Sequence, residues 1–227
     1  MTTFVLVPGA GGAAWYWHRL VDELERRGHE AVAVDLPADD GSAGLAAYAD
    51  AVVRAVGSRS PVVLVAQSMG GLTAPLVCER VPVELLVLVN AMVPLPGETG
   101  AEWWTATGQA AARAAHAARV GLTDDPEDMT IAFFHDVPAD VAAAAQTQPF
   151  AQSERPFADP WPLRSWPDVP TRVVAGREDR LFPLEFQRRV AAERLGIDVD
   201  EVPGGHLVAL SRPGELADQL EAYLRSL

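Results

Sequence analysis

Short, almost continuously apolar runs recur along the chain, and amphipathic stretches separate them. The runs cover residues 3–7, 30–34, 62–66, 85–90, 171–175 and 197–202. Strands that are covered on both faces need such runs, because neither face meets water. The amphipathic stretches cover 15–27, 42–56, 69–81, 183–195 and 213–226, and several begin at Pro or end before Gly, as helices do. This alternation predicts an α/β fold with a doubly wound, mostly parallel sheet of about six strands.

The strand pattern stops between residues 93 and 168. This segment is rich in alanine and aromatic residues, and it predicts helices over 98–120, 127–135 and 139–146 before a proline-rich return. It is too long for a plain loop, and long insertions usually serve function. We therefore expect a core made of residues 1–92 and 169–227, and a helical cap, residues 93–168, over the carboxyl edge of the sheet.

The composition excludes several classes of partner and of chemistry. Lys and Arg number 18 against 31 Asp and Glu, which gives a net charge of −13 and disfavours nucleic acid and anionic membranes as partners. All the cations are Arg, which excludes chemistry that needs a lysine amine, such as a Schiff base. The single cysteine, Cys78, excludes an intramolecular disulfide and a site built from Cys pairs, and we expect it to pack rather than react. No paired-His spacing indicates a metal, so we expect neither a metal nor a cofactor.

The amino-terminal run is apolar but has no basic region before it. No apolar run reaches the ~18 residues that a membrane span needs. We expect a cytoplasmic protein that acts on a small molecule, without a membrane partner. The sequence leaves the oligomeric state open, a homodimer included.

A glycine-rich turn follows the first predicted strand. Gly9, Gly11 and Ala14 match the pattern G-x-G-x-x-A, and Asp35 ends the second strand, as in a dinucleotide-binding fingerprint. Asp35 lies farther from Gly9 than the usual ~20 positions, and aromatic residues crowd the start of the next helix. An NAD-binding enzyme of the Rossmann type stays open as an alternative.

A second turn, Gln67-Ser68-Met69-Gly70-Gly71, follows the third predicted strand. A serine between small residues at a sharp strand-to-helix turn projects its hydroxyl above the sheet, which is the arrangement of a nucleophile elbow. Ala66 precedes it, so the pattern is A-x-S-x-G rather than G-x-S-x-G. Ser68 is therefore the candidate nucleophile, and a simple helix N-cap is the other interpretation.

A serine nucleophile needs a base, and the base needs an orienting acid. His206 lies in the glycine-bounded loop after the last predicted strand, and Asp179 lies in the turn after the run 171–175. The other four histidines lie in or beside predicted helices and are expected to pack or face solvent. The chain order Ser, Asp, His is that of the α/β-hydrolases, and all three residues follow strands, where open α/β sheets bind ligands.

With these motifs the chain resembles the α/β-hydrolase superfamily from residue 4 to about residue 213. The start F-V-L-V-P-G-A, followed by Trp15, Trp17 and Asp35-Leu36, is similar to the methylesterase and hydroxynitrile-lyase family, in its esterase-like branch. Pro8 replaces the usual His of that start. The lyase branch has a Thr at the position of Gly9 and a Lys soon after the triad His, and this chain has neither.

The resemblance implies a serine hydrolase that cleaves a small carboxylic ester, thioester or lactone through an acyl-enzyme intermediate. Ser68 would attack the carbonyl, His206 would take its proton, and Asp179 would orient the imidazole. The backbone N–H groups of Ala10 and Met69 are the expected oxyanion donors. The expected substrate-binding residues are Gly9, Gly11, Trp103, Phe134 and Leu207. A non-hydrolytic lyase on the same triad, the NAD-binding enzyme and a non-catalytic ligand receptor are the alternatives.

Overall fold

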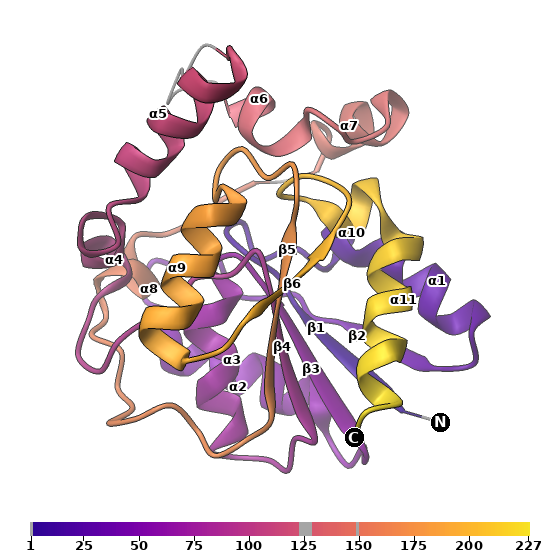
Figure 1. Cartoon of the computed structure of the whole chain (residues 1–227). Helices are drawn as coiled ribbons and strands as arrows, with labels where there is room; N and C mark the ends of the chain where they lie inside the picture. Colours follow the sequence, from indigo (N-terminus) through magenta and orange to yellow (C-terminus); the bar gives the residue numbers. More distant parts are fainter. Residues whose placement is uncertain (1, 123–128, 149) are drawn as a thin grey trace.

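The computed structural model describes residues 2–122, 129–148 and 150–227, and six parallel strands form its centre (Figure 1). The sheet order is β2-β1-β3-β4-β5-β6, and every neighbouring pair is parallel. The sheet predicted as mostly parallel is thus parallel throughout, and each predicted strand is present to within two residues at either end. The strands are β1 (Thr3–Val7), β2 (Glu30–Ala33), β3 (Val62–Gln67), β4 (Leu85–Val89), β5 (Thr171–Gly176) and β6 (Val199–Val202).

Helices cover both faces of the sheet, as continuous apolar strands require. In β1, Phe4 and Leu6 face a core shared with α1 (His18–Arg26) and α11 (Pro213–Leu224). The alternate residues Val5 and Val7 face the other core, built with α2 (Leu45–Val56), α3 (Gly70–Cys78) and α9 (Leu184–Leu195). Successive side chains of a strand point to opposite faces, so a strand between two cores must be apolar at every position. The doubly wound prediction is confirmed.

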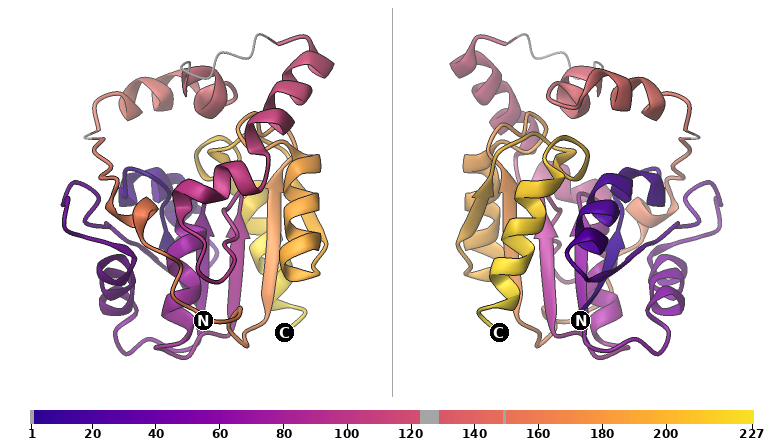
Figure 2. Two further views of the ribbon diagram at one scale, coloured as in Figure 1. Left: turned by 90° about the vertical axis from the view of Figure 1, so that its left-hand side faces the viewer. Right: turned by 90° about the vertical axis from the view of Figure 1, so that its right-hand side faces the viewer.

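The segment 93–168 forms helices that lie largely beyond the carboxyl ends of the strands (Figures 1 and 2). The single helix predicted over 98–120 is two helices, because Gly108 adopts φ +66 and breaks the run. A capping box between Thr99 and Glu102 starts the first of them. The helices are α4 (Gly100–Ala106), α5 (Gln109–Val120), α6 (Met129–Phe134), α7 (Ala139–Ala145) and α8 (Arg155–Ala158). Residues 127 and 128 of the predicted helix 127–135 lie outside the described residues.

Two short helices near the site do not follow the predicted boundaries. The stretch 15–27 divides into a 3-10 turn, η1 (Ala14–Trp17), and α1. A four-residue helix, α10 (Val208–Ser211), directly follows the loop that carries His206. No helix within the described ranges combines the length and the hydropathy needed to cross a bilayer.

Candidate active site

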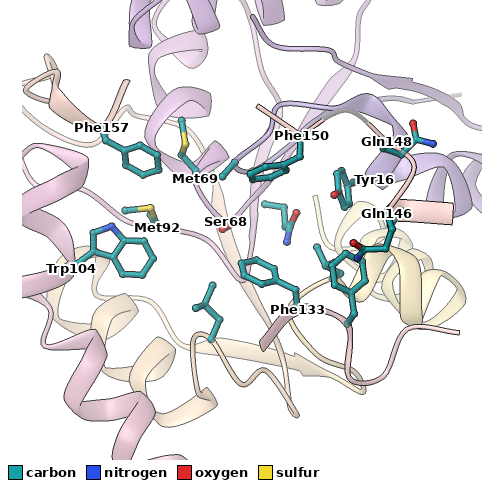
Figure 3. Close-up of a pocket in the computed structure, with 17 residues that line it drawn as sticks. Tyr16, Ser68, Met69, Met92, Trp104, Phe133, Gln146, Gln148, Phe150 and Phe157 are labelled. Atoms are coloured by element: carbon teal, nitrogen blue, oxygen red, sulfur yellow. The ribbon is translucent and has the colours of Figure 1, made fainter. Parts of the chain in front are cut away.

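A cavity of about 500 Å³ lies between the carboxyl ends of the strands and the helices of segment 93–168. Ser68 lies at its centre, with Trp104, Met92 and Phe157 on one side and Tyr16, Gln146 and Gln148 on the other (Figure 3). None of the described lining side chains carries a formal charge, and the walls are mainly aromatic and aliphatic. The lining residues are Gly9, Ala10, Tyr16, Gln67, Ser68, Met69, Met92, Trp104, Phe133, Phe134, Ala145, Gln146, Gln148, Phe150, Phe157, Leu181 and Leu207.

Ser68 occupies a strained turn between β3 and α3. Its φ is +52, a value that a non-glycine residue rarely adopts outside functional turns. The two glycines after it are required by packing: a Cβ on Gly70 would lie 2.8 Å from the carbonyl oxygen of Pro8, and one on Gly71 would clash with that of Met92. The turn is closed by bonds from the backbone N–H of Met92 and of Gly71 to the carbonyl of Ser68. This is the geometry that the motif predicts for a nucleophile elbow.

The glycine turn after β1 lies against Ser68. A Cβ on Gly9 would be 2.9 Å from the Cβ of Ser68 and 3.4 Å from its Oγ. Both Ala10 and Met69 line the cavity, and neither backbone N–H donates to another described residue. Backbone amides without a partner are what the predicted oxyanion donors require, so both residues stay candidates for that role.

The other end of the glycine turn is held by a hydrogen bond to Asp35 and by close packing. Asp35 Oδ1 accepts a hydrogen bond of 2.7 Å from the backbone N–H of Ala14, so this carboxylate caps the start of η1. Gly12 adopts φ +62, and its Cβ would meet Ala38 and Leu36. The glycines therefore serve close packing between the turn, Ser68 and the loop after β2.

Asp179 and His206 are both fully buried and form a hydrogen-bonded pair. The distance from His206 Nδ1 to Asp179 Oδ2 is 2.8 Å. The other oxygen, Asp179 Oδ1, accepts from the backbone N–H groups of Leu181 and Phe182 at 2.8 and 2.9 Å. A buried carboxylate is tolerated when its oxygens are satisfied in this way. The pair thus supplies an imidazole held by an acid, as a serine nucleophile needs.

The opposite nitrogen of the imidazole, Nε2, is buried and has no hydrogen-bond partner among the described residues, Ser68 included. The ring packs edge-to-face against Phe133, which lines the cavity, with 4.9 Å between the ring centres. Gln67, the residue before Ser68, donates a 3.0 Å bond to the carbonyl of His206. These contacts hold the imidazole next to the serine turn and leave its Nε2 without a hydrogen-bond partner among the described residues.

Asn90 is a site residue that the sequence interpretation missed. It follows β4, is fully buried and adopts φ +47. Its Nδ2 donates to the carbonyls of Gly205 and His206 at 3.1 and 2.9 Å, and its Oδ1 accepts from the backbone N–H of Gly176 at 2.7 Å. Asn90 therefore ties the turn that carries Asp179 to the loop that carries His206. The available signal is a polar residue at the carboxyl end of an otherwise apolar run, but the run by itself predicts only that the strand ends there.

The predicted substrate-binding residues divide into two groups. Gly9, Phe134 and Leu207 line the cavity. Trp103 does not: it is fully buried between Phe182 and Phe186, and its indole N–H donates to the carbonyl of Val93. Gly11 also lies outside the lining, because Phe150 covers it and Gln152 binds its N–H.

Trp104, the neighbour of Trp103, lines the cavity instead. Successive helix residues point about 100° apart, so when Trp103 fills the core, Trp104 turns toward the cavity. Tyr16 and Gln67 also line the cavity, although nothing in the sequence distinguished them from packing residues. Within the described part of the chain, no cluster of three or more His, Cys, Asp or Glu side chains is placed to hold a metal ion.

Known proteins match this chain over nearly its whole length. Esterase PIR7B of Oryza sativa subsp. japonica is 28% identical over 252 residues, covering 96% of this chain and 93% of the relative. Alpha-hydroxynitrile lyase of Arabidopsis thaliana is 26% identical over 251 residues, with 96% and 95% covered. The crystal structure of polyneuridine aldehyde esterase superposes with a TM-score of 0.79 at 23% identity, covering 99% of each chain.

The model of one protein family, described as the alpha/beta hydrolase family, matches residues 4–219. The match begins in β1, includes the serine turn, the acid turn and the histidine loop, and ends in α11. It agrees with the parallel sheet and with the relatives above. The chain belongs to the alpha/beta hydrolase family.

Proposed function

We propose that this protein is a serine hydrolase that cleaves a small carboxylic ester through an acyl-enzyme intermediate. The observation that carries the proposal is a strained serine turn that lines an apolar cavity and is joined, through the bond from Gln67 to the carbonyl of His206, to a buried acid-imidazole pair. The names of relatives, esterases among them, support the same reaction class.

In the proposed reaction, Ser68 Oγ attacks the ester carbonyl and His206 Nε2 takes its proton. Asp179 holds the Nδ1–H tautomer through the 2.8 Å bond and stabilises the imidazolium that forms. The backbone N–H groups of Met69 and Ala10 stabilise the oxyanion. His206 then protonates the departing alkoxide. A water molecule, deprotonated by the same imidazole, releases the acid and restores Ser68.

The cavity favours an uncharged, largely apolar ester. A charged substrate would lose its hydration against walls that offer no formal charge in return, which is costly. Aromatic rings such as Trp104 and Phe157 offer a large area for burying an aliphatic or aromatic group. Thioesters and lactones of the same size and polarity are covered by the same chemistry.

A lyase that cleaves cyanohydrins is the main alternative on this triad, and a lyase is among the relatives. Cleavage would leave a cyanide ion in the cavity, where an anion without a cation costs several kcal/mol. The chain has no lysine, and Leu207, which follows His206, is buried and apolar. An ester oxyanion would instead meet two backbone donors, so hydrolysis is the better match.

Turnover of p-nitrophenyl esters of graded acyl length tests the proposal, with Ser68→Ala as the matched control. We expect hydrolysis by the wild-type protein, a loss of ~10³-fold or more in Ser68→Ala, and fluorophosphonate labelling at Ser68 alone. Labelling at another serine, or turnover that survives Ser68→Ala, would refute the assignment of the nucleophile.

A further inference from the structure

Two glycines precede His206 in its loop, and glycine is the residue type with the widest range of allowed backbone angles. Gly204 adopts φ +115 and Gly205 directly precedes the histidine. Asn90 Nδ2 donates hydrogen bonds to the carbonyl groups of Gly205 and His206. The position of the imidazole therefore also depends on what holds the N–H side of the two glycines.

Two carboxylates accept hydrogen bonds from those N–H groups, one from the core and one from the segment 93–168. Glu178, in the turn after β5, accepts from the N–H of Gly204. Asp136, in the segment 93–168, accepts from the N–H of Gly205 with 2.7 Å between N and Oδ2. The loop has no spare room at this point, since a Cβ on Gly205 would lie 2.6 Å from His135 Nε2 and 2.7 Å from Asp136 Oδ1.

The residues around Asp136 contact the histidine loop at several points. Phe133 packs its ring edge-to-face on the His206 ring, and Val137 belongs to a small apolar cluster with Leu207 and Leu210. Asp136 adds the polar contact between these apolar ones. One short stretch, residues 133–137, therefore packs against the loop that carries the proposed base.

The carboxylate of Asp136 is not explained by an ion pair. Its side chain is only 14% exposed, and Oδ1 is buried without a hydrogen-bond partner among the described residues. Among the described residues, the basic group within 4.0 Å of this carboxylate is His135, whose Nε2 lies 3.9 Å from Oδ1. Burial lowers the pKa of that imidazole, which favours its neutral form. Burying a carboxylate is costly, and an apolar residue would join α6 to the loop at less cost. The bond to Gly205 is the interaction that sets this position apart.

We propose that Asp136 is a positioning residue for His206: it fixes the Gly205 amide and thereby the direction in which the imidazole faces Ser68. The proposal rests on the proposed hydrolase function. It makes the segment 93–168 part of the catalytic geometry as well as part of the cavity wall. If the loop were free to move the imidazole by ~1 Å, turnover would fall by about 10- to 100-fold.

The test compares Asp136→Ala with Asp136→Asn, which keeps an acceptor oxygen for Gly205 and removes the charge. In p-nitrophenyl acetate hydrolysis we expect Asp136→Ala to lower kcat by about 10-fold or more with KM within about two-fold. Asp136→Asn should stay within about three-fold of wild-type. The matched control is Asp159→Ala. Asp159 is another carboxylate of the segment 93–168, and it accepts a 3.0 Å hydrogen bond from the backbone N–H of Leu45. Its removal should leave kcat unchanged.

Three results would overturn the proposal. They are a kcat of Asp136→Ala within two-fold of wild-type, a loss confined to KM and thermal stability, or an equal loss in the two variants. If Asp136→Ala does not fold, Asp136→Asn still decides, because a loss beyond 10-fold in that isosteric variant contradicts a role through the hydrogen bond.

A second readout does not depend on ester turnover. The low-field proton resonance of His206 Nδ1–H reports its bond to Asp179, and we expect it to weaken or shift in Asp136→Ala and to return in Asp136→Asn. An unaltered resonance in Asp136→Ala overturns the positioning role. Absence of Ser68-dependent turnover in the wild-type protein would instead count against the proposed function, so the two failures are distinguishable.

Discussion

Replacing Gly9 with alanine tests whether the turn after β1 acts on the chemistry at Ser68. The added Cβ would lie 2.9 Å from the Cβ of Ser68, 3.3 Å from the carbonyl oxygen of Gln67 and 3.4 Å from Ser68 Oγ. Carbon atoms that are not bonded pack best at about 3.5–4.0 Å, so the turn and the serine must separate by about 0.6–1.1 Å. Because Ala10 follows directly, the same shift moves its N–H away from the position of the oxyanion.

The expected loss follows from that displacement. A misplacement near 1 Å, or the loss of one oxyanion donor, costs on the order of 10²-fold. We therefore expect kcat/KM of Gly9→Ala on p-nitrophenyl acetate to fall ~10²-fold, which corresponds to about 2.7 kcal/mol in the barrier. The loss should lie mainly in kcat, because the oxyanion bond forms chiefly in the transition state.

The control is Gly41→Ala, since an added Cβ there meets no atom within 4 Å and the residue is exposed. Thermal unfolding of both variants, measured beside their kinetics, separates a local displacement from a loss of fold. If Gly9→Ala is folded and keeps kcat/KM within three-fold of wild-type, the turn does not help to hold the oxyanion and the reasoning is wrong.

Three further results are expected. Asp179→Asn should lower kcat by ~10³-fold or more. Asp35→Asn should leave kcat nearly unchanged, because the amide oxygen can still accept from the backbone at the start of η1. Equal losses of kcat in the two variants, measured in steady-state assays, would contradict this assignment. Partial burial raises the pKa of the Cys78 thiol to about 12, so iodoacetamide at pH 8 should label it ~10³-fold more slowly than a free cysteine, and rapid labelling of the folded protein would contradict the raised pKa. Mandelonitrile should release no cyanide above background in a preparation that hydrolyses p-nitrophenyl acetate, and cyanide release abolished by Ser68→Ala would favour the lyase.

Local chemistry made much of the fold and the candidate nucleophile predictable. A strand between two helical layers must be apolar at every position, so the runs around β1, β3 and β4 identified the parallel sheet. The tight turn at Ser68 needs Gly70 and Gly71 beside it, and that requirement appears in the sequence as adjacent small residues. Asp179 and His206 were identifiable because parallel strands bring their carboxyl ends to one edge.

The sequence alone therefore determined the α/β architecture and which serine, acid and histidine to consider, since these depend on residue order and short-range sterics. Tertiary structure decided what surrounds them. Whether Trp103 or Trp104 faces the cavity depends on the rotation of α4 against Phe182, which no local pattern contains. The roles of Asn90 and Asp136 depend on contacts with Gly205, which lies far from both along the chain. A buried polar side chain acquires its role from the partner that satisfies it, and only the folded chain brings that partner within hydrogen-bond distance.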